Sequence, residues 1–254
     1  MDNKKIKIVK IKGGLGNQLF QYSFAVFIKE LFNIDVMLDL SWFKNQKKRQ
    51  FILPDFVDIS LFATSEQNNY STISKILNYR SEFIFTKMIL NKKLPFVNIF
   101  DGYWQNKNFA DKLKKNKLLK SNFNKPIINE NYYVIHLRRT DFKQSKAHNL
   151  LDYSYYLKNL KFFSDKKIYA LSDDKRELDF IINNTKTNVE IIDCNEKDAF
   201  NIIYNSKGGI LSNSTFCWWP CYLSGEDNFV LPYNWLKSSN IFDSNLHIDS
   251  SLII

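Results

Sequence analysis

The chain has 254 residues, 44% of them hydrophobic and 16% aromatic, enough to bury one large core or the cores of two modest domains. This composition excludes a disordered protein, and a content of only 7 Gly and 5 Pro argues against a turn-dense all-β protein. The formal net charge is +10. Its distribution is uneven, because residues 1–130 carry 22 Lys and Arg against 11 Asp and Glu, whereas residues 131–254 carry 14 against 15.

The basic first half predicts an anionic partner, such as an anionic membrane surface or a phosphorylated acceptor, although lysines spread over solvated faces give the same count. No nucleic-acid-binding motif accompanies the charge, so no nucleic acid partner is expected. Three cysteines without a disulfide framework are typical of a reducing compartment. With no apolar signal segment or membrane span, the predicted location is the cytoplasm, with peripheral attachment to the inner face of the membrane as an option.

In chain order, the first half opens with an alternating strand at residues 5–12, a glycine turn, a helix over 17–32 and a strand at 35–39. Such a β–α–β unit predicts a parallel sheet with a right-handed crossover. A mostly helical stretch, a short strand and a lysine-rich helix follow at 66–93, 96–100 and 109–119. The segment 121–131 is rich in Asn and Ser and indicates a domain boundary, which gives domains of 1–128 and 129–254.

The second half repeats the alternation of strands and helices. Strands are expected at 132–137, 167–171, 189–193, 208–211 and 229–232, and helices at 152–162, 174–184, 196–205 and from Thr215 onward. This is the pattern of a second doubly wound unit. The sequence therefore predicts an α/β protein of the GT-B type, with two facing Rossmann-like domains and a cleft between them.

The glycine turn Gly13-Gly14-Leu15-Gly16-Asn17-Gln18 is the first candidate site. Its glycines let a ligand approach the backbone, and the amides at the start of the helix attract anions. The spacing is one glycine short of the dinucleotide fingerprint, because Leu19 stands at the third position. One interpretation is therefore an NAD(P)-dependent oxidoreductase that binds its cofactor at Gly14-Leu15-Gly16. Another is that the turn has only a structural role.

The strand 132–137 is followed by Arg138, Arg139 and Asp141. Parallel strands open at their carboxyl ends onto the ligand crevice of α/β proteins. Two adjacent guanidiniums there make a fork for an anion such as a diphosphate, unless they belong to a surface salt-bridge patch. Since the chain has no Asp-x-Asp to hold a metal, fixed arginines are expected to balance the charge of a departing diphosphate.

Two further strand ends carry polar residues. Ser172 and Asp173 precede Asp174, which is well placed to cap a helix, and Asp173 is left to accept hydrogen bonds from a base or ribose. The other strand end supplies Asn213, Ser214, Thr215 and Phe216, where hydroxyl groups cap a helix whose N-terminus also suits a phosphate. His136 is either a packing element or a ligand contact, and the histidines are too isolated for a metal or nucleophilic triad.

Together these segments resemble the α-1,2-fucosyltransferases of glycosyltransferase family eleven. The matching motifs, in order, are Gly13-Gly14-Leu15-Gly16-Asn17-Gln18-Leu19-Phe20-Gln21-Tyr22, Gly102-Tyr103-Trp104-Gln105, His136-Leu137-Arg138-Arg139-Thr140-Asp141, Leu171-Ser172-Asp173-Asp174 and Ser212-Asn213-Ser214-Thr215-Phe216-Cys217-Trp218-Trp219. The resemblance covers most of the chain, but residues 40–95 contain no matching motif. It implies a GT-B fold with an acceptor-side first domain and a donor-binding second domain.

The resemblance also implies an inverting, metal-independent transfer of L-fucose from GDP-fucose to a galactoside hydroxyl, in bacterial surface glycan or O-antigen synthesis. The acceptor is then a galactoside-containing glycan, in some cases lipid-linked, and no cofactor or metal is expected. By the same implication Arg138 and Arg139 meet the diphosphate, Asp173 and the backbone near His136 hold guanosine, Ser214, Thr215 and Phe216 line the phosphate pocket, and Asn17 reaches the donor from the first domain. Asp141 is either the general base or an anchor for an arginine.

Alternatives to a fucosyltransferase remain open at this point. A dinucleotide oxidoreductase would use the glycine turn, and a noncatalytic glycan-binding protein would need neither arginine. A related GDP-6-deoxyhexose such as GDP-colitose would occupy the same donor site. The arginine pair and the Ser-Asn-Ser-Thr segment favour sugar transfer, because they add a second anion site.

Overall fold

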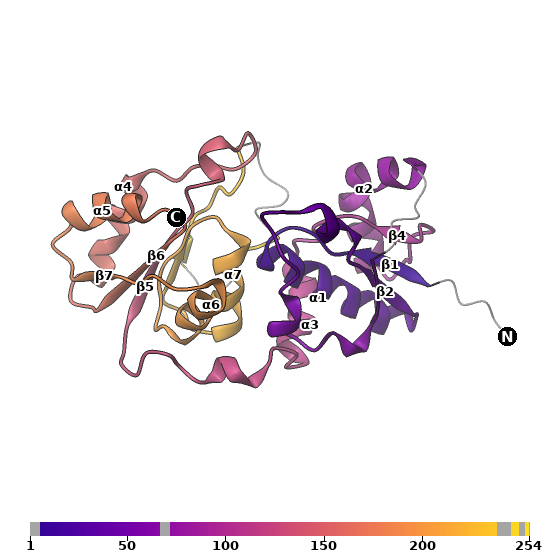
Figure 1. Cartoon of the computed structure of the whole chain (residues 1–254), viewed down its shortest axis with the longest axis horizontal. Helices are drawn as coiled ribbons and strands as arrows, with labels where there is room; N and C mark the ends of the chain where they lie inside the picture. The colour runs from indigo at the N-terminus through magenta and orange to yellow at the C-terminus, as the bar shows by residue number, and fades with distance from the viewer. Residues whose placement is uncertain (1–5, 67–71, 238–244, 249–251, 254) are drawn as a thin grey trace. The chain divides into compact units, whose positions relative to one another are not determined.

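The structure is a computed structural model that describes residues 6–66, 72–237, 245–248 and 252–253, the side chains of 72–80 and 252–253 excepted. The chain divides into two compact units, Met1–Lys120 and Ser121–Ile254. Each unit has its own parallel sheet (Figure 1). Residues 121–128, assigned to the first domain on the sequence, belong with the second unit.

The described residues of the first unit form a four-stranded sheet and three α-helices. Its strands follow the spatial order β3-β2-β1-β4, and each of these pairs is parallel. The elements are β1 Lys7–Lys10, α1 Leu15–Phe32, β2 Val36–Asp39, β3 Ala63–Ser65, α2 Thr72–Leu90, β4 Ile99–Phe100 and α3 Lys107–Lys115, with short 3-10 helices η1 Ser41–Asn45, η2 Leu53–Asp55 and η3 Ile59–Leu61.

The core of the first unit lies mainly around α1. Phe24 stacks on Trp104 with ring centroids 4.1 Å apart and meets Phe100 and Phe109 edge-on. These four rings are essentially fully buried. Helix α1 therefore ties the sheet to α3 and to the loop after β4 through aromatic packing, which contributes beyond the buried area alone.

The second unit is a six-stranded sheet covered by helices. Its spatial order β10-β9-β8-β5-β6-β7 is all parallel and corresponds to the doubly wound 3-2-1-4-5-6 arrangement. The elements are β5 Tyr133–Leu137, α4 Tyr153–Asn159, β6 Ile168–Ser172, α5 Lys175–Asn183, β7 Val189–Ile191, α6 Glu196–Asn205, β8 Gly209–Ile210, α7 Thr215–Ser224, β9 Phe229–Leu231 and β10 Leu252–Ile253, with η4 Ser121–Asn124, η5 Phe142–Gln144 and η6 Leu160–Phe163.

Helices α4 and α5 lie on one side of this sheet and α6 and α7 on the other (Figure 1). The apolar core under α4 and α5 includes Ile135, Leu137, Tyr156 and Leu178. Between β5 and β8 the backbones approach so closely that a Cβ on Gly209 would lie 2.0 Å from the Val134 carbonyl oxygen. Glycine is therefore required at the point where the order of the strands reverses.

Two strands were missing from the expectation. Strand β3 follows residues without a recognisable pattern, and its side chains are largely exposed, so the hydrophobic alternation that marks a strand is absent there. Strand β10 extends the sheet beyond β9, which the sequence had placed last. The expected alternation is otherwise present, with most elements shorter at their ends than predicted. No helix among the described residues is long and apolar enough to cross a membrane.

Candidate active site

The topological switch point of the second unit lies between β5 and β8. The chain runs from β5 through β6 to β7 in one direction, then returns to place β8 on the other side of β5. Ligands of doubly wound sheets bind outside the carboxyl ends of the strands at such a point. The segments that follow β5, β6 and β8 here carry most of the residues singled out in the sequence.

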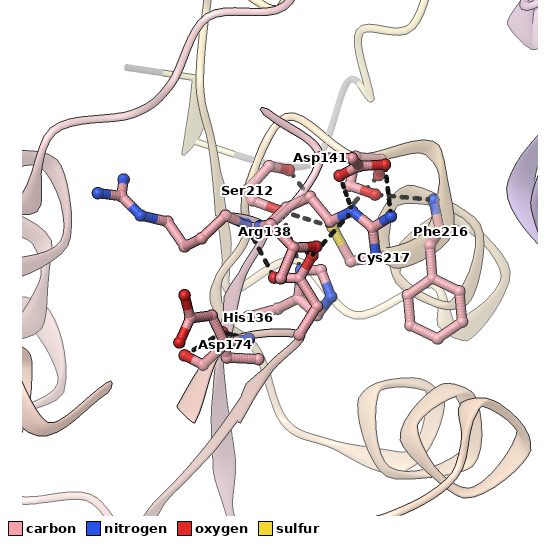
Figure 2. A network of polar contacts seen from close by, with 12 residues as sticks. His136, Arg138, Asp141, Asp174, Ser212, Phe216 and Cys217 are labelled. Carbon is pink, nitrogen blue, oxygen red and sulfur yellow. Dashed lines mark hydrogen bonds and ion pairs between the residues drawn. The ribbon is translucent and has the colours of Figure 1, made fainter. Parts of the chain in front are cut away.

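His136 is buried on the face of the sheet that carries α7. Its Nδ1 lies 2.9 Å from Ser212 Oγ, and its ring is tilted against Phe216 with centroids 5.7 Å apart (Figure 2). Burial, assisted by the charge of Arg138, lowers the pKa of His136 to about 3. The imidazole is therefore neutral at physiological pH and links the ends of β5 and β8.

Arg138 follows on the same face, two residues beyond His136. Its Nε and Nη2 donate to the two carboxylate oxygens of Asp141 at 2.9 and 2.7 Å, and its Nε lies 3.3 Å from Asp173 Oδ2 (Figure 2). The Arg138 side chain retains 19% of its exposure, against 49% for Asp141. This bidentate geometry fixes the plane of the guanidinium at the rim of the switch point.

Arg139 points to the other face, because consecutive residues of an extended chain project to opposite sides. Its Nε donates to Glu177 Oε2 at 2.9 Å and its Nη1 to the Leu151 carbonyl at 2.5 Å, while the guanidinium stacks over the Tyr153 ring at 4.7 Å. The residue is only 6% exposed. The structure therefore does not bring the two arginines into the single fork expected from their adjacency.

Asp173 is engaged by the loop that contains the arginines. Its carboxylate accepts from the backbone amides of Arg139 and Thr140 at 2.8 and 3.3 Å and from Thr140 Oγ1 at 2.5 Å. An aspartate at the end of β6 thus holds the segment after β5 in place. This differs from the expectation of a carboxylate left for a base or ribose, since these bonds occupy both of its oxygens.

Ser172 and Asp174 form a local turn at the start of α5. Ser172 Oγ accepts from the Asp174 amide and donates to the Asp174 carbonyl, both at 3.0 Å. Asp174 occupies the N-cap position, but its side chain makes no capping hydrogen bond and instead pairs with Lys143 at 3.0 Å. The predicted position of the cap was correct and the predicted role of the side chain was wrong.

The segment after β8 begins helix α7. Ser214 is its N-cap and accepts from the Phe216 amide at 3.3 Å, as its residue type predicts. Thr215 opens the helix next to it, partly exposed. The positive end of a ten-residue helix therefore lies at the switch point, beside the strand end that carries His136.

Asn213 is buried and joins two neighbouring loops. Its Nδ2 donates to the carbonyls of Asn149 and Trp235, each at 2.8 Å. The same two loops pair directly through an antiparallel bridge between His148 and Leu236. Asn213 therefore supports the wall of the candidate site through its side-chain nitrogen, whereas its buried Oδ1 has no hydrogen-bond partner among the described residues.

The glycine turn of the first unit leads into α1 with Gly14 as N-cap and Leu15 and Gly16 in the first turn. Gly13 has φ +83°, the left-handed conformation that favours glycine. Asn17 Oδ1 accepts from Gln105 Nε2 at 2.8 Å, so two sequence motifs meet here.

Gln18 was expected to contact substrate, but it is fully buried and braces the turn. Its Nε2 donates to the carbonyls of Gly13 and Gln50 at 3.0 and 2.9 Å. Its Oε1 accepts from the amides of Ile52 and Leu53, both at 3.2 Å. The backbone bonds satisfy this amide completely, which corrects the expected role.

Several supporting residues were not foreseen. Glu177 and Tyr153 contact the Arg139 guanidinium, and Lys143 Nζ lies 2.5 Å from the other Glu177 oxygen, Oε1. Glu177 stands three residues after Asp174, a spacing that signals a helix start but not a partner far back in the chain. Among the residues that the structure describes, no group of three or more His, Cys, Asp and Glu side chains is arranged to hold a metal ion.

Comparison with known proteins agrees with this fold and motif order. The sequence model of glycosyl transferase family 11 matches residues 2–248. Among solved structures, the fucosyltransferase NodZ from Bradyrhizobium superposes with a TM-score of 0.59 and 12% identity, over 87% of this chain and 93% of NodZ. A complex of NodZ α-1,6-fucosyltransferase with GDP gives a TM-score of 0.58 and 13% identity, with the same coverage. The fold is therefore that of the GT-B glycosyltransferases, as predicted.

Two curated relatives match over nearly their whole length. The O-antigen biosynthesis glycosyltransferase WbnK of Escherichia coli is 25% identical, over 94% of this chain and 97% of WbnK. An α-1,2-colitosyltransferase of Escherichia coli is also 25% identical, over 94% of this chain and 96% of that protein. The chain belongs to glycosyl transferase family 11 and is a glycosyltransferase.

Proposed function

We propose that this protein transfers L-fucose from GDP-fucose to a galactoside hydroxyl with inversion and without a metal ion, as an α-1,2-fucosyltransferase of bacterial surface glycan synthesis. The proposal is supported by the family match, by the switch-point geometry of the second unit, and by the two relatives, which are named as an O-antigen biosynthesis glycosyltransferase and an α-1,2-colitosyltransferase.

The reaction breaks the bond between the anomeric carbon of fucose and the β-phosphate oxygen, and forms a bond from that carbon to the acceptor oxygen. The electron pair of the broken bond goes to GDP, and the acceptor proton leaves to a base or to solvent. Charge on the diphosphate grows in the transition state, so fixed positive groups at its position accelerate the step.

The observation that carries the proposal is the position of Arg138 beside the α7 N-terminus. Arg138 follows His136 on one face of β5, and His136 contacts Ser212 and Phe216 at the start of α7. A guanidinium and a helix N-terminus on the same side of a switch point form a site suited to a diphosphate. We assign Arg138, Ser214, Thr215 and Phe216 to donor binding, and the backbone near His136 to the nucleoside.

Other roles change from those that the resemblance implied. Arg139, Asp173, Ser172 and Asn213 become positioning residues, because their polar groups hold neighbouring segments. Asp141 is an anchor for Arg138, given their bidentate contact. Asn17, with Gly14, Leu15 and Gly16 beside it, is the proposed contact from the first unit to the donor.

Thermal unfolding with GDP tests the donor site directly. GDP at saturating concentration should raise the melting temperature of the native chain in the presence of EDTA, and NAD or NADP should not. Transfer to a β-galactoside, followed by mass spectrometry of the product, then tests the activity. Stabilisation by NAD alone, or loss of all transfer in EDTA, would contradict the proposal.

GDP-colitose is a second candidate donor, favoured by the relative named as an α-1,2-colitosyltransferase. The two donors share the nucleotide and differ only in the sugar. A parallel assay with GDP-fucose and GDP-colitose at equal concentration decides between them through the ratio of kcat/KM values.

The basic first half suggests where the enzyme works. A net positive charge in residues 1–130 would draw that part to the anionic inner face of the cytoplasmic membrane, where a lipid-linked acceptor is displayed. Vesicles containing anionic lipid should sediment with the protein at low salt, and release it at high salt. Equal sedimentation with neutral vesicles would reject this location.

A further inference from the structure

The first unit also has a topological switch point, between β1 and β4. The chain runs β1, β2 and β3 to one side and places β4 on the other side of β1. The carboxyl ends of these neighbours lead into the glycine turn and into Asp101-Gly102-Tyr103-Trp104-Gln105. The proposed donor function uses the turn but leaves this second motif without a role.

The backbone of this motif is held in an unusual conformation. Trp104 has φ +54°, although it is bulky and 1% exposed. A non-glycine residue there costs free energy, and such strain persists only where the surroundings enforce it. Strain of this kind concentrates at functional sites, where neighbouring groups hold the backbone in place.

Glu82 from α2 is the main support of the strained turn. Its Oε2 accepts from the Tyr103 amide at 3.0 Å and its Oε1 from the Trp104 amide at 2.6 Å. A Cβ on Gly102 would lie 2.6 Å from Glu82 Oε2, so only glycine permits this approach. A largely buried carboxylate thus accepts hydrogen bonds from two consecutive backbone amides.

Helix α1 holds the same turn from its other side. Gln21 Nε2 donates to the Gly102 carbonyl at 3.1 Å, while Gln21 Oε1 accepts from the Lys12 amide at 2.9 Å. Gln105 donates to Asn17 at 2.8 Å. These bonds join the loop after β4 to the loop after β1, so the two strand ends form one surface.

Tyr103 is the side chain that this arrangement presents. It remains 37% exposed, and Lys12 Nζ lies 4.9 Å from its ring centroid. Lys12 is itself fixed by Asp101, with 2.5 Å between Nζ and Oδ1. A partly exposed aromatic ring beside a fixed ammonium group, in a loop that also contains the Gln105 amide, matches a saccharide, which offers apolar C–H faces and many hydroxyl groups.

We infer that the β1/β4 switch point of the first unit binds the acceptor saccharide, with Tyr103 in contact with the sugar and Glu82 as the residue that positions Tyr103. This rests on the proposed function, in which the first unit is the acceptor side, and adds to it the residues that contact the acceptor and position that contact. Gln105, which donates to Asn17, lies at the same surface and supplies an amide group for sugar hydroxyls.

Steady-state kinetics with GDP-fucose and methyl β-D-galactopyranoside test this inference. Tyr103→Ala should raise the acceptor KM about tenfold or more, equivalent to about 1.4 kcal/mol of binding, with a smaller change in kcat. Tyr103→Phe keeps the ring and should stay close to native. Glu82→Gln should raise the acceptor KM while leaving the GDP-induced thermal shift unchanged, because it replaces one acceptor oxygen by a donor facing an amide.

Phe96→Ala is the matched control, because Phe96 is an aromatic ring of the same unit that is 83% exposed. An unchanged acceptor KM in Tyr103→Ala, or an equal rise in Phe96→Ala, would overturn the inference. The inference would also fail if the galactoside did not increase the rate at which GDP is released from GDP-fucose. That outcome would leave donor binding intact. If the native chain neither binds GDP nor consumes the donor, the proposed function fails and this inference fails with it.

Discussion

Arg139 and Glu177 form a buried ion pair in which residues 38 positions apart meet at 2.9 Å. Their side chains are 7% and 14% exposed, so solvent screens the pair only weakly. The pair joins the loop after β5 to helix α5. This ion pair explains why Arg139 is fixed in place. It also means that the effects of replacing Arg139 and Arg138 can be told apart by experiment.

Replacement of Arg138 should remove catalysis and leave the fold intact. Arg138→Ala takes away the proposed transition-state contact to the diphosphate, so kcat should fall about 10²-fold or more. Arg138→Lys should recover little, because an ammonium group lacks the planar fork that meets Asp141. The measurement is kcat with GDP-fucose, together with a circular dichroism melt as the control for folding. Near-native turnover in Arg138→Ala would remove Arg138 from the donor site.

Replacement of Arg139 should act first on stability. Arg139→Ala leaves Glu177 with Lys143 and Tyr153 as partners, so the loss should lie below the ~3–5 kcal/mol that an uncompensated buried charge costs. Urea unfolding measures the loss, and activity should fall with the population of folded protein. If Arg139→Ala unfolds at the same urea concentration as the native chain yet loses transfer, then Arg139 contacts the donor and the buried-anchor role is incorrect.

Acid unfolding should report on Glu177. Burial alone would raise the pKa of this carboxyl from 4.5, but hydrogen bonds from Lys143 and Tyr153 and the charge of Arg139 lower it to about 2. A lowered pKa in the folded state means that the charged form stabilises the fold above pH 4.5, and that this contribution is lost as the pH falls toward 2.

The unfolding midpoint in urea should therefore fall more steeply for the native chain than for Glu177→Gln as the pH is lowered through this range. Glu177→Gln should also be the less stable of the two at pH 7. Glu190→Gln is the control, because Glu190 is 57% exposed in its pair with Lys167. Parallel curves for the native chain and Glu177→Gln would show that Glu177 is not the acid-sensitive group.

Gly209→Ala should destabilise the second unit at the β5/β8 pairing. The new Cβ would lie 2.0 Å from the Val134 carbonyl oxygen at a backbone φ of +150°, so the strands must separate. Strain of this kind costs about 1–3 kcal/mol, measured as a shift in thermal or urea unfolding. At Gly14 the nearest atom to an added Cβ is Arg49 Nη1 at 3.4 Å, so Gly14→Ala should change stability less.

The alternation of strands and helices was readable because buried parallel strands and amphipathic helices leave local patterns. What the sequence did not reveal depends on partners far along the chain. Gln18 has the chemistry of a ligand contact, and only the positions of Gly13, Gln50, Ile52 and Leu53 show that its amide is fully used.

The candidate site follows the same rule. The order of the motifs located the strand ends, but the direction of each side chain required the register of the sheet. The adjacency of the two arginines in the sequence suggested a fork. In the extended backbone, however, the Arg138 side chain points toward α7 and the Arg139 side chain toward α4 and α5. Strand β3 had no apolar alternation to find, because its residues face solvent.

One asparagine has a consequence for how such enzymes diversify. Asn213 binds the Asn149 and Trp235 carbonyls at once, so the loops after β5 and β9, which also pair with each other, share this support. A change in length or course of one loop would displace the carbonyl that the other depends on. We expect the lengths of the two loops to change together among related chains, while the asparagine between them stays the same.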